Sequence, residues 1–148
     1  MELRSVEELM DLLYACRGAR DVPEPGRPPV DPHDHALRTA ALLRRAHPAD
    51  KELQVAGLVR PVGRLLWPGD PAGRAGRTAD AVRALLGERV SRLLRDRPGR
   101  GVPADDLLAL RQAAEEGRTA GFDAGVLEDW RTVLELLAAR NSRLGAVE

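Results

Sequence analysis

The sequence predicts an all-α fold, a compact bundle of about six or seven helices in a single domain over residues 1–148. Three observations lead to this expectation. Apolar residues recur at helical spacing along most of the chain, and alternating strand patterns are nearly absent. The length of 148 residues suits one domain with one core. Stretches rich in proline and glycine, at 18–32, 68–76 and 98–103, divide a helical core of 5–140 into helix-length segments.

Each segment between these breaks carries its own helix signals. The first helix is expected over 5–17, with Ser5 as its N-cap and Glu8 completing a capping box. Further helices are expected over 33–46, 49–67, 78–86, 88–96, 104–116 and 124–140. The sequence therefore predicts short helices joined by loops, with no repeat and no low-complexity tail.

One segment, 55–67, conflicts with its own pattern. It is apolar on nearly every side, as in a buried helix, yet it contains Arg60, Pro61 and Arg64. An unpaired buried charge is costly, and an internal proline removes a backbone hydrogen bond and clashes with the preceding turn. This conflict marks the segment as a candidate functional site.

Composition excludes several classes of partner and cofactor. Lys plus Arg equals Asp plus Glu, at 23 each, and only 3% of residues are aromatic, so we expect neither nucleic acid nor a membrane as a partner. Cys16 is the only cysteine, which excludes a disulfide framework and a cysteine metal site. Because no signal peptide pattern or long apolar run is present, we expect a cytoplasmic protein.

Three arginines lie on the apolar stripes of three different expected helices. They are Arg60, Arg97 and Arg131. Amphipathic arginines can bury their stems while the guanidinium reaches water. The alternative is that these helices face a shared interior cavity built for a polar molecule.

Three runs of sequence carry a resemblance to a known family. They are DHALRTAALL at 34–43, LQVAGLVRPVGR at 53–64 and ADAVRALLGERV at 79–90. In order and spacing they resemble the HD-domain superfamily of metal-dependent phosphohydrolases. Within it they are most similar to the small di-iron HD-domain oxygenases of phosphonate catabolism. The resemblance covers about residues 5–140 and implies the helical HD-domain fold.

The same resemblance implies where metal ligands would lie. The family's first ligand histidine matches His35. The His-Asp dyad that names the superfamily falls on Arg60 and Pro61. The histidine that closes the motif, and that in the oxygenases helps to bind substrate, falls on Arg64.

The remaining ligand positions also fall on arginines. The next histidine corresponds to Arg74 or a residue close to it, the following one to Arg97, and the terminal acidic ligand to Arg131. Divalent first-row metals need imidazole or carboxylate donors, whereas arginine has no lone pair to offer. We therefore expect a pseudo-HD domain with no metal site and no cofactor, and not a metal-dependent phosphohydrolase or di-iron oxygenase.

The candidate ligand-binding residues follow from these positions. They are Arg60, Arg64, Arg97, Arg131 and His35, with Arg74 added from the gapped loop. Guanidinium groups bind carboxylate and phosphate as bidentate forks, so the expected partner is an anionic small molecule: phosphate, phosphonate or carboxylate. The competing expectation is internal neutralisation by carboxylates, for which the candidates are Asp34, Asp80, Asp96, Glu128 and Asp129.

Two other functions remain open from the sequence. One is an interaction module without a ligand pocket, whose surface binds another protein or a second copy of the chain. The other is a metal-independent enzyme in which arginines stabilise an anionic intermediate and His35 or Glu24 carries a proton. His35 is the only catalytic candidate at a family ligand position. We expect it to be a core histidine that forms a hydrogen bond with a carboxylate or a carbonyl.

Overall fold

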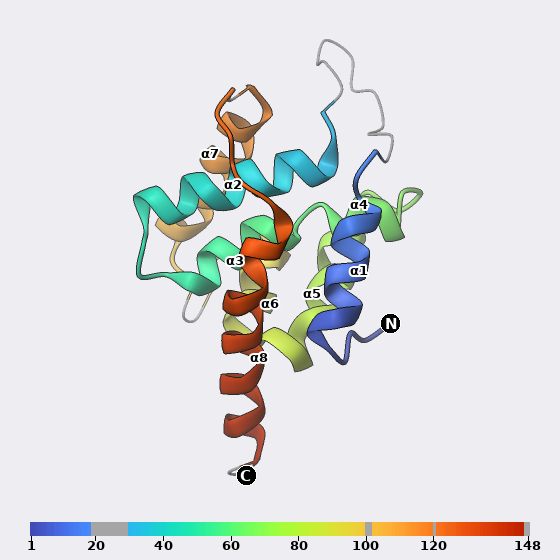
Figure 1. Cartoon of the computed structure of the whole chain (residues 1–148). Coiled ribbons are helices and arrows are strands. Elements are labelled where there is room, and N and C mark those ends of the chain that lie inside the picture. The colour runs from blue at the N-terminus through green and yellow to red at the C-terminus, as the bar shows by residue number, and fades with distance from the viewer. Residues whose placement is uncertain (19–29, 100–101, 120, 147–148) are drawn as a thin grey trace.

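The computed structural model describes residues 1–18, 30–99, 102–119 and 121–146, and this part of the chain is helical, as the sequence predicts (Figure 1). It contains no strand beyond an isolated bridge between Gly99 and Val102. The helices in chain order are α1 (Val6–Ala15), α2 (Pro32–Ala46), α3 (Lys51–Val59), α4 (Val62–Leu66), α5 (Arg74–Leu86), α6 (Glu88–Arg95), α7 (Ala104–Thr119), the 3-10 helix η1 (Leu127–Trp130) and α8 (Arg131–Ala146).

The helices pack around α3. Every residue from Leu53 to Val59 is buried, and α3 contacts α2, α6, α7 and α8. Helix α2 packs against both α3 and α7, and α5 packs against α6. Helix α8 contacts α1 and α5, and its C-terminal end extends beyond the other helices (Figure 1). The apolar pattern of 53–59 is thus explained by a helix surrounded by other helices.

The expected helix over 49–67 is wrong in one respect, because it is two helices. Helix α3 ends at Val59 and α4 begins at Val62, with Pro61 between them as the N-cap of α4. Proline lacks the N–H that would continue the helical ladder, and its ring clashes with the preceding turn. The chain therefore bends at the residues that conflicted with the sequence pattern.

Other expected boundaries also differ. Helix α5 begins at Arg74, inside the expected loop 68–76, so the loop is shorter than predicted. The last helical region begins as the short η1 at Leu127, and α8 follows it as far as Ala146. Helix ends are the least certain part of any reading from periodicity, since the first turn buries few side chains.

The expected N-cap at Ser5 is confirmed. Its hydroxyl oxygen accepts a hydrogen bond from the Glu8 amide at 3.2 Å. Asp31 caps α2 in the same way, and Pro32 follows at the first helical position, where its missing N–H costs nothing.

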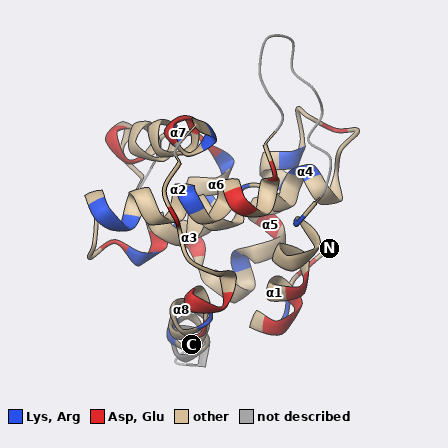
Figure 2. Ribbon diagram, turned by 45° about the horizontal axis from the view of Figure 1, so that its top comes forward, with Lys and Arg blue, Asp and Glu red and all other residues tan. Residues whose placement is uncertain are grey.

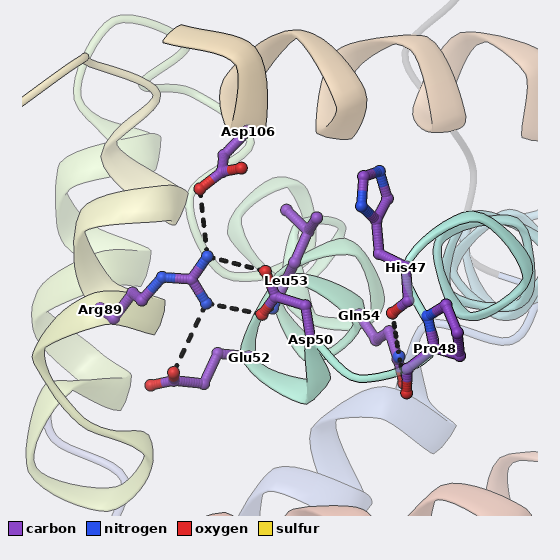
Figure 3. A network of polar contacts seen from close by, with 8 residues as sticks. All are labelled: His47, Pro48, Asp50, Glu52, Leu53, Gln54, Arg89 and Asp106. Atoms are coloured by element: carbon purple, nitrogen blue, oxygen red, sulfur yellow. Dashed lines mark hydrogen bonds and ion pairs between the residues drawn. The ribbon is translucent and has the colours of Figure 1, made fainter. Parts of the chain in front are cut away.

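Arg89 joins the N-terminal turns of three helices (Figure 3). From α6 its guanidinium donates to both carboxylate oxygens of Asp50, at 2.6 and 2.8 Å, and to Asp106 of α7 at 3.1 Å. Glu52 of α3 lies 3.4 Å away. Burial raises the pKa of Asp50, but hydrogen bonds from Arg89 and the Leu53 amide outweigh burial and hold it below its ordinary value. The network fixes α3, α6 and α7 relative to one another.

Charges of both signs are interspersed along the helices rather than separated into a basic and an acidic face (Figure 2). Within the described ranges, none of the helices is long and apolar enough to cross a membrane.

Candidate functional site

A cavity of about 680 Å³ opens at the bend between α3 and α4. Its walls come from α2, the junction of α3 and α4, the start of α5, the end of α6 and one face of α7. Small-molecule sites typically measure about 300–1,000 Å³. The described residues that line the cavity are Val30, Pro32, His35, Thr39, Gly57, Arg60, Pro61, Arg64, Pro68, Pro71, Arg74, Ala75, Thr78, Leu94, Asp96, Arg111, Ala114, Glu115 and Arg118.

The break at Pro61 places two of the arginines. Arg60 is the C-cap of α3, with its amide bonded to the Ala56 carbonyl at 3.1 Å, and Arg64 lies one turn further on in α4. Residues four apart lie on the same side of a helix, and both arginines line the cavity on either side of the break at Pro61. The sequence conflict at this segment therefore has a structural outcome, a local turn that lines a cavity with cations.

A close contact between α4 and α5 brings in Arg74. A Cβ added to Gly63 would lie 2.5 Å from the Thr78 hydroxyl and 3.4 Å from the Arg74 carbonyl, so only glycine allows this approach. The Thr78 hydroxyl in turn donates to that carbonyl at 2.7 Å. Arg74 thus lies at the first residue of α5 and lines the same cavity as Arg64.

Positive charge exceeds negative charge in the described lining. Five arginines line the cavity, namely Arg60, Arg64, Arg74, Arg111 and Arg118, against the two carboxylates Asp96 and Glu115. Asp96 is already engaged, because its Oδ1 accepts from Arg111 Nε at 2.9 Å and its carbonyl from Arg111 Nη2 at 3.3 Å. Among the described lining residues, guanidinium groups therefore outnumber carboxylates.

Arg60 carries the clearest electrostatic cost. Burial lowers its pKa, the positive charges of Arg64 and Arg111 lower it further, and Asp96 alone acts in the opposite direction. None of the ion pairs found among the described residues involves the Arg60 side chain. Arg60 is therefore a partly buried cation near other cations, with only an already engaged carboxylate to offset it.

Arg74 supplies a second sign of an unfilled interaction. Its Nε is buried and has no hydrogen-bond partner among the described residues. Buried donors are nearly always paired, so this unpaired donor adds to the cost of placing the Arg74 guanidinium beside the other cations of the cavity wall.

His35 lies in the cavity wall beneath α7. Its Nε2 bonds the Ala114 carbonyl oxygen at 2.6 Å, as expected for a core histidine bonded to a carbonyl. Burial lowers the pKa of His35, the bond to Ala114 opposes this, and the nearby charges of Arg118, Arg38 and Arg64 lower it further. The ring is therefore neutral near pH 7.

The neighbouring His33 faces elsewhere. It bonds Asp34 at 3.2 Å through Nδ1 and stacks on the Tyr14 ring, with centroids 6.3 Å apart. It is absent from the cavity lining, because residues two apart in a helix do not lie on the same face.

Two expected lining residues are corrected by the structure. Arg131 lies at the start of α8, where Glu7 and Glu128 pair with it, as the alternative of internal neutralisation anticipated for Glu128. Arg97 is exposed just after α6. Neither lines the cavity, because the stripe of α8 faces α1 and α5 and because α6 ends at Arg95, before Arg97.

Two cationic residues of the cavity escaped sequence reasoning. Arg111 and Arg118 lie seven residues apart on α7, on one face with Ala114 and Glu115 between them. A spacing of seven residues indicates one face of a helix. Because Arg118 lies beyond the helix end expected at 116, the sequence does not predict that the two arginines share a face. Glu24, the other proton carrier considered, lies outside the described residues.

The residues present do not fit the di-iron centre that the family resemblance implies. Of the aligned ligand positions, only that of His35 holds a side chain with a lone pair to donate; the others hold arginine or, at 61, proline. Within the described part of the chain, no group of three or more His, Cys, Asp or Glu side chains is placed to hold a metal ion.

The comparisons with known proteins add no relative. No protein-family model matches the chain, and no match was found among curated proteins or solved structures. The similarity to HD domains therefore stays a prediction from the residues that carry it.

Proposed function

We propose that this chain is a metal-free binding protein for a small oxyanion, a phosphate, phosphonate or carboxylate, held in the arginine cavity. The observation that carries the proposal is Arg60, a partly buried guanidinium in the cavity wall that makes no ion pair among the described residues and lies near Arg111, which already holds Asp96. Several cations together in a partly buried site cost several kcal/mol unless an anion neutralises them. A bound oxyanion would offset that cost with charge-assisted, bidentate hydrogen bonds.

The unpaired donor of Arg74 and the position of Arg60 support the same function. Arg74 Nε is buried without a partner, and Arg60 lies among like charges. An interaction module without a pocket would instead be expected to have a filled interior and arginines paired to carboxylates, as Arg131 is. The cavity of about 680 Å³ therefore favours a ligand over that alternative.

The proposal extends to the family resemblance. In an HD-domain lineage that has lost its metal, the arginines at the former metal-ligand positions 60 and 74 would bind directly the kind of oxyanion that a metal once held, together with Arg64 at the position that binds substrate in the oxygenases. Two of the degenerate positions, Arg97 and Arg131, lie outside the cavity and take no part in this proposal.

Thermal unfolding with inorganic phosphate, sulfate and citrate, at constant ionic strength set with chloride, tests the function. A ligand at about 100 times its Kd stabilises a protein by about 2.7 kcal/mol, which raises the Tm of a chain of this size by about 5–10 °C. The test variant is Arg60→Met, which keeps the apolar stem. Arg97→Met is the matched control, since it removes the same charge from an exposed residue outside the cavity.

We expect at least one of these anions to raise the Tm of the wild type and of Arg97→Met, and to have little effect on Arg60→Met. Without anion, Arg60→Met should unfold no earlier than the wild type, because it removes a charge from beside Arg64 and Arg111. The absence of anion-dependent stabilisation in the wild type would refute the function. An equal rise in Tm for the two variants would show that the anion does not bind at Arg60.

A further inference from the structure

The His35 ring is held in one orientation by two contacts with α7. Its Nε2 bonds the Ala114 carbonyl at 2.6 Å. Its Cδ2 edge lies against Gly117, where an added Cβ would be 3.4 Å from Cδ2 and 2.9 Å from the Thr39 hydroxyl. In an imidazole ring, Nδ1 and Cε1 form the edge opposite Cδ2. Nδ1 has no hydrogen-bond partner among the described residues and is not among the buried unpaired atoms, so we assign the edge that carries it to the cavity that His35 lines.

The bond to Ala114 also fixes the tautomer. A carbonyl oxygen only accepts hydrogen bonds, so Nε2 must carry the proton. Burial and the positive charges of Arg38 on α2, Arg64 on α4 and Arg118 on α7 disfavour a second proton on the ring. Nδ1 is then an unprotonated acceptor of hydrogen bonds.

An acceptor in this position is chemically distinct from the rest of the basic wall. The guanidinium groups offer only N–H donors, which suit the oxygens of an anion. A fully ionised oxyanion has no proton to give to Nδ1. A hydroxyl does, and because it is neutral it is not repelled by the neighbouring arginines, as an ammonium group would be.

We infer that the ligand of the cavity is a hydroxylated organic anion, its oxyanion held by Arg60 and Arg74 and its alcohol donating a hydrogen bond to His35 Nδ1. This inference rests on the proposed function and narrows it. The cavity of about 680 Å³ has room for a carbon skeleton beside the anionic group. Proline, valine and leucine side chains (Val30, Pro32, Pro61, Leu94) provide apolar wall for that skeleton.

His35 acts in this arrangement as a specificity-determining residue. A site with a polar group placed for a ligand hydroxyl discriminates against the analogue that lacks it, because the group is then left unpaired or solvated by a trapped water. One hydrogen bond of this kind corresponds to a difference of about 10-fold in Kd.

Isothermal titration calorimetry with two matched pairs of ligands tests the inference. The pairs are sn-glycerol 3-phosphate against n-propyl phosphate, and malate against succinate. We expect the hydroxylated member of at least one pair to bind the wild type about 10-fold more tightly. In His35→Phe this preference should fall to within about 2-fold, while n-propyl phosphate or succinate still binds.

Nitrogen-15 NMR of the wild-type imidazole supplies a readout that does not depend on the variant folding. It should show neutral His35 with its proton on Nε2, and an Nδ1 resonance that moves with sn-glycerol 3-phosphate more than with n-propyl phosphate. A proton on Nδ1, or equal affinities within both pairs, would overturn the inference and leave the proposed function intact. Failure of all four ligands to bind would count against the proposed function itself.

Discussion

Substitution of Arg89 by methionine removes the charge that connects the N-terminal turns of α3, α6 and α7 while keeping an apolar stem. The guanidinium of Arg89 makes a bidentate pair with Asp50, at 2.6 and 2.8 Å, and a third bond to Asp106 at 3.1 Å (Figure 3). Each of these groups is about a quarter exposed, from 24% for Asp106 to 27% for Arg89 and Asp50. The network is therefore neither a fully solvated pair nor a buried one.

The expected loss of stability follows from this intermediate exposure of the charged groups. Exposed ion pairs contribute about 0–1 kcal/mol, whereas breaking a buried pair by removing one partner costs about 3–5 kcal/mol. The loss of Arg89 leaves three carboxylates, those of Asp50, Glu52 and Asp106, close together without a counter-charge. We expect Arg89→Met to lower the free energy of unfolding by about 2–3 kcal/mol and the Tm by about 5–10 °C.

Urea denaturation followed by circular dichroism at 222 nm measures this loss, with the m-value unchanged if the two end states are unchanged. The matched control is Arg83→Met on α5, which breaks the single ion pair with Glu88 at 2.7 Å, where both side chains are about half exposed. The control should lose less than about 1 kcal/mol. If Arg89→Met costs no more than Arg83→Met, the network does not fix the three helices and this reasoning is wrong.

Three other predictions concern packing, pH and thiol reactivity. Gly117→Ala should destabilise the protein by about 1–3 kcal/mol in urea, because its Cβ would lie 2.9 Å from the Thr39 hydroxyl. Gly76→Ala in α5 should be neutral or stabilising, because its Cβ would meet only Arg95 Nη1 at an ordinary contact distance of 3.6 Å; equal effects would contradict the close packing of α2 on α7. Because the pKa of Asp50 is lowered in the folded protein, its contribution to stability is present above the unfolded-state pKa of about 3.9 and is lost as the pH falls through the folded pKa. Asp50→Asn should therefore lose less stability than the wild type below about pH 4, and parallel curves of stability against pH would refute this. Burial raises the pKa of Cys16 to about 11 and makes its thiol inaccessible. Ellman's reagent at pH 8 should therefore label Cys16 only as fast as the protein opens, and immediate labelling of the native protein would contradict the burial.

Much of the fold could be predicted from the sequence because helical periodicity is a local signal. The positions of α1, α2 and α6 are close to those expected over 5–17, 33–46 and 88–96, and Ser5 is the expected cap. What periodicity could not decide is how the chain passes Pro61. The apolar residues on both sides satisfy one helix or two, whereas in the structure the break falls at Pro61 and α4 packs against α5.

The candidate site was predictable in part for a related reason. Arg60, Arg64 and His35 lie in contiguous motifs, and the structure places all three in one cavity wall. The apolar stripes on which Arg97 and Arg131 lie indicate that these residues are near the packed side of a helix. They do not indicate which other helix packs against that side. Arg131 meets Glu7, which is distant in sequence and belongs to α1.

The measurement that tests the central claim most directly is a crystal structure of the protein grown without sulfate or phosphate and soaked in millimolar tungstate, a tetrahedral oxyanion with a strong anomalous signal. The proposed function predicts an anomalous peak in the cavity, with tungstate oxygens about 2.7–3.2 Å from guanidinium nitrogens of Arg60 or Arg74. A cavity without tungstate, with Arg60 bonded to carboxylates of its own chain, would contradict it.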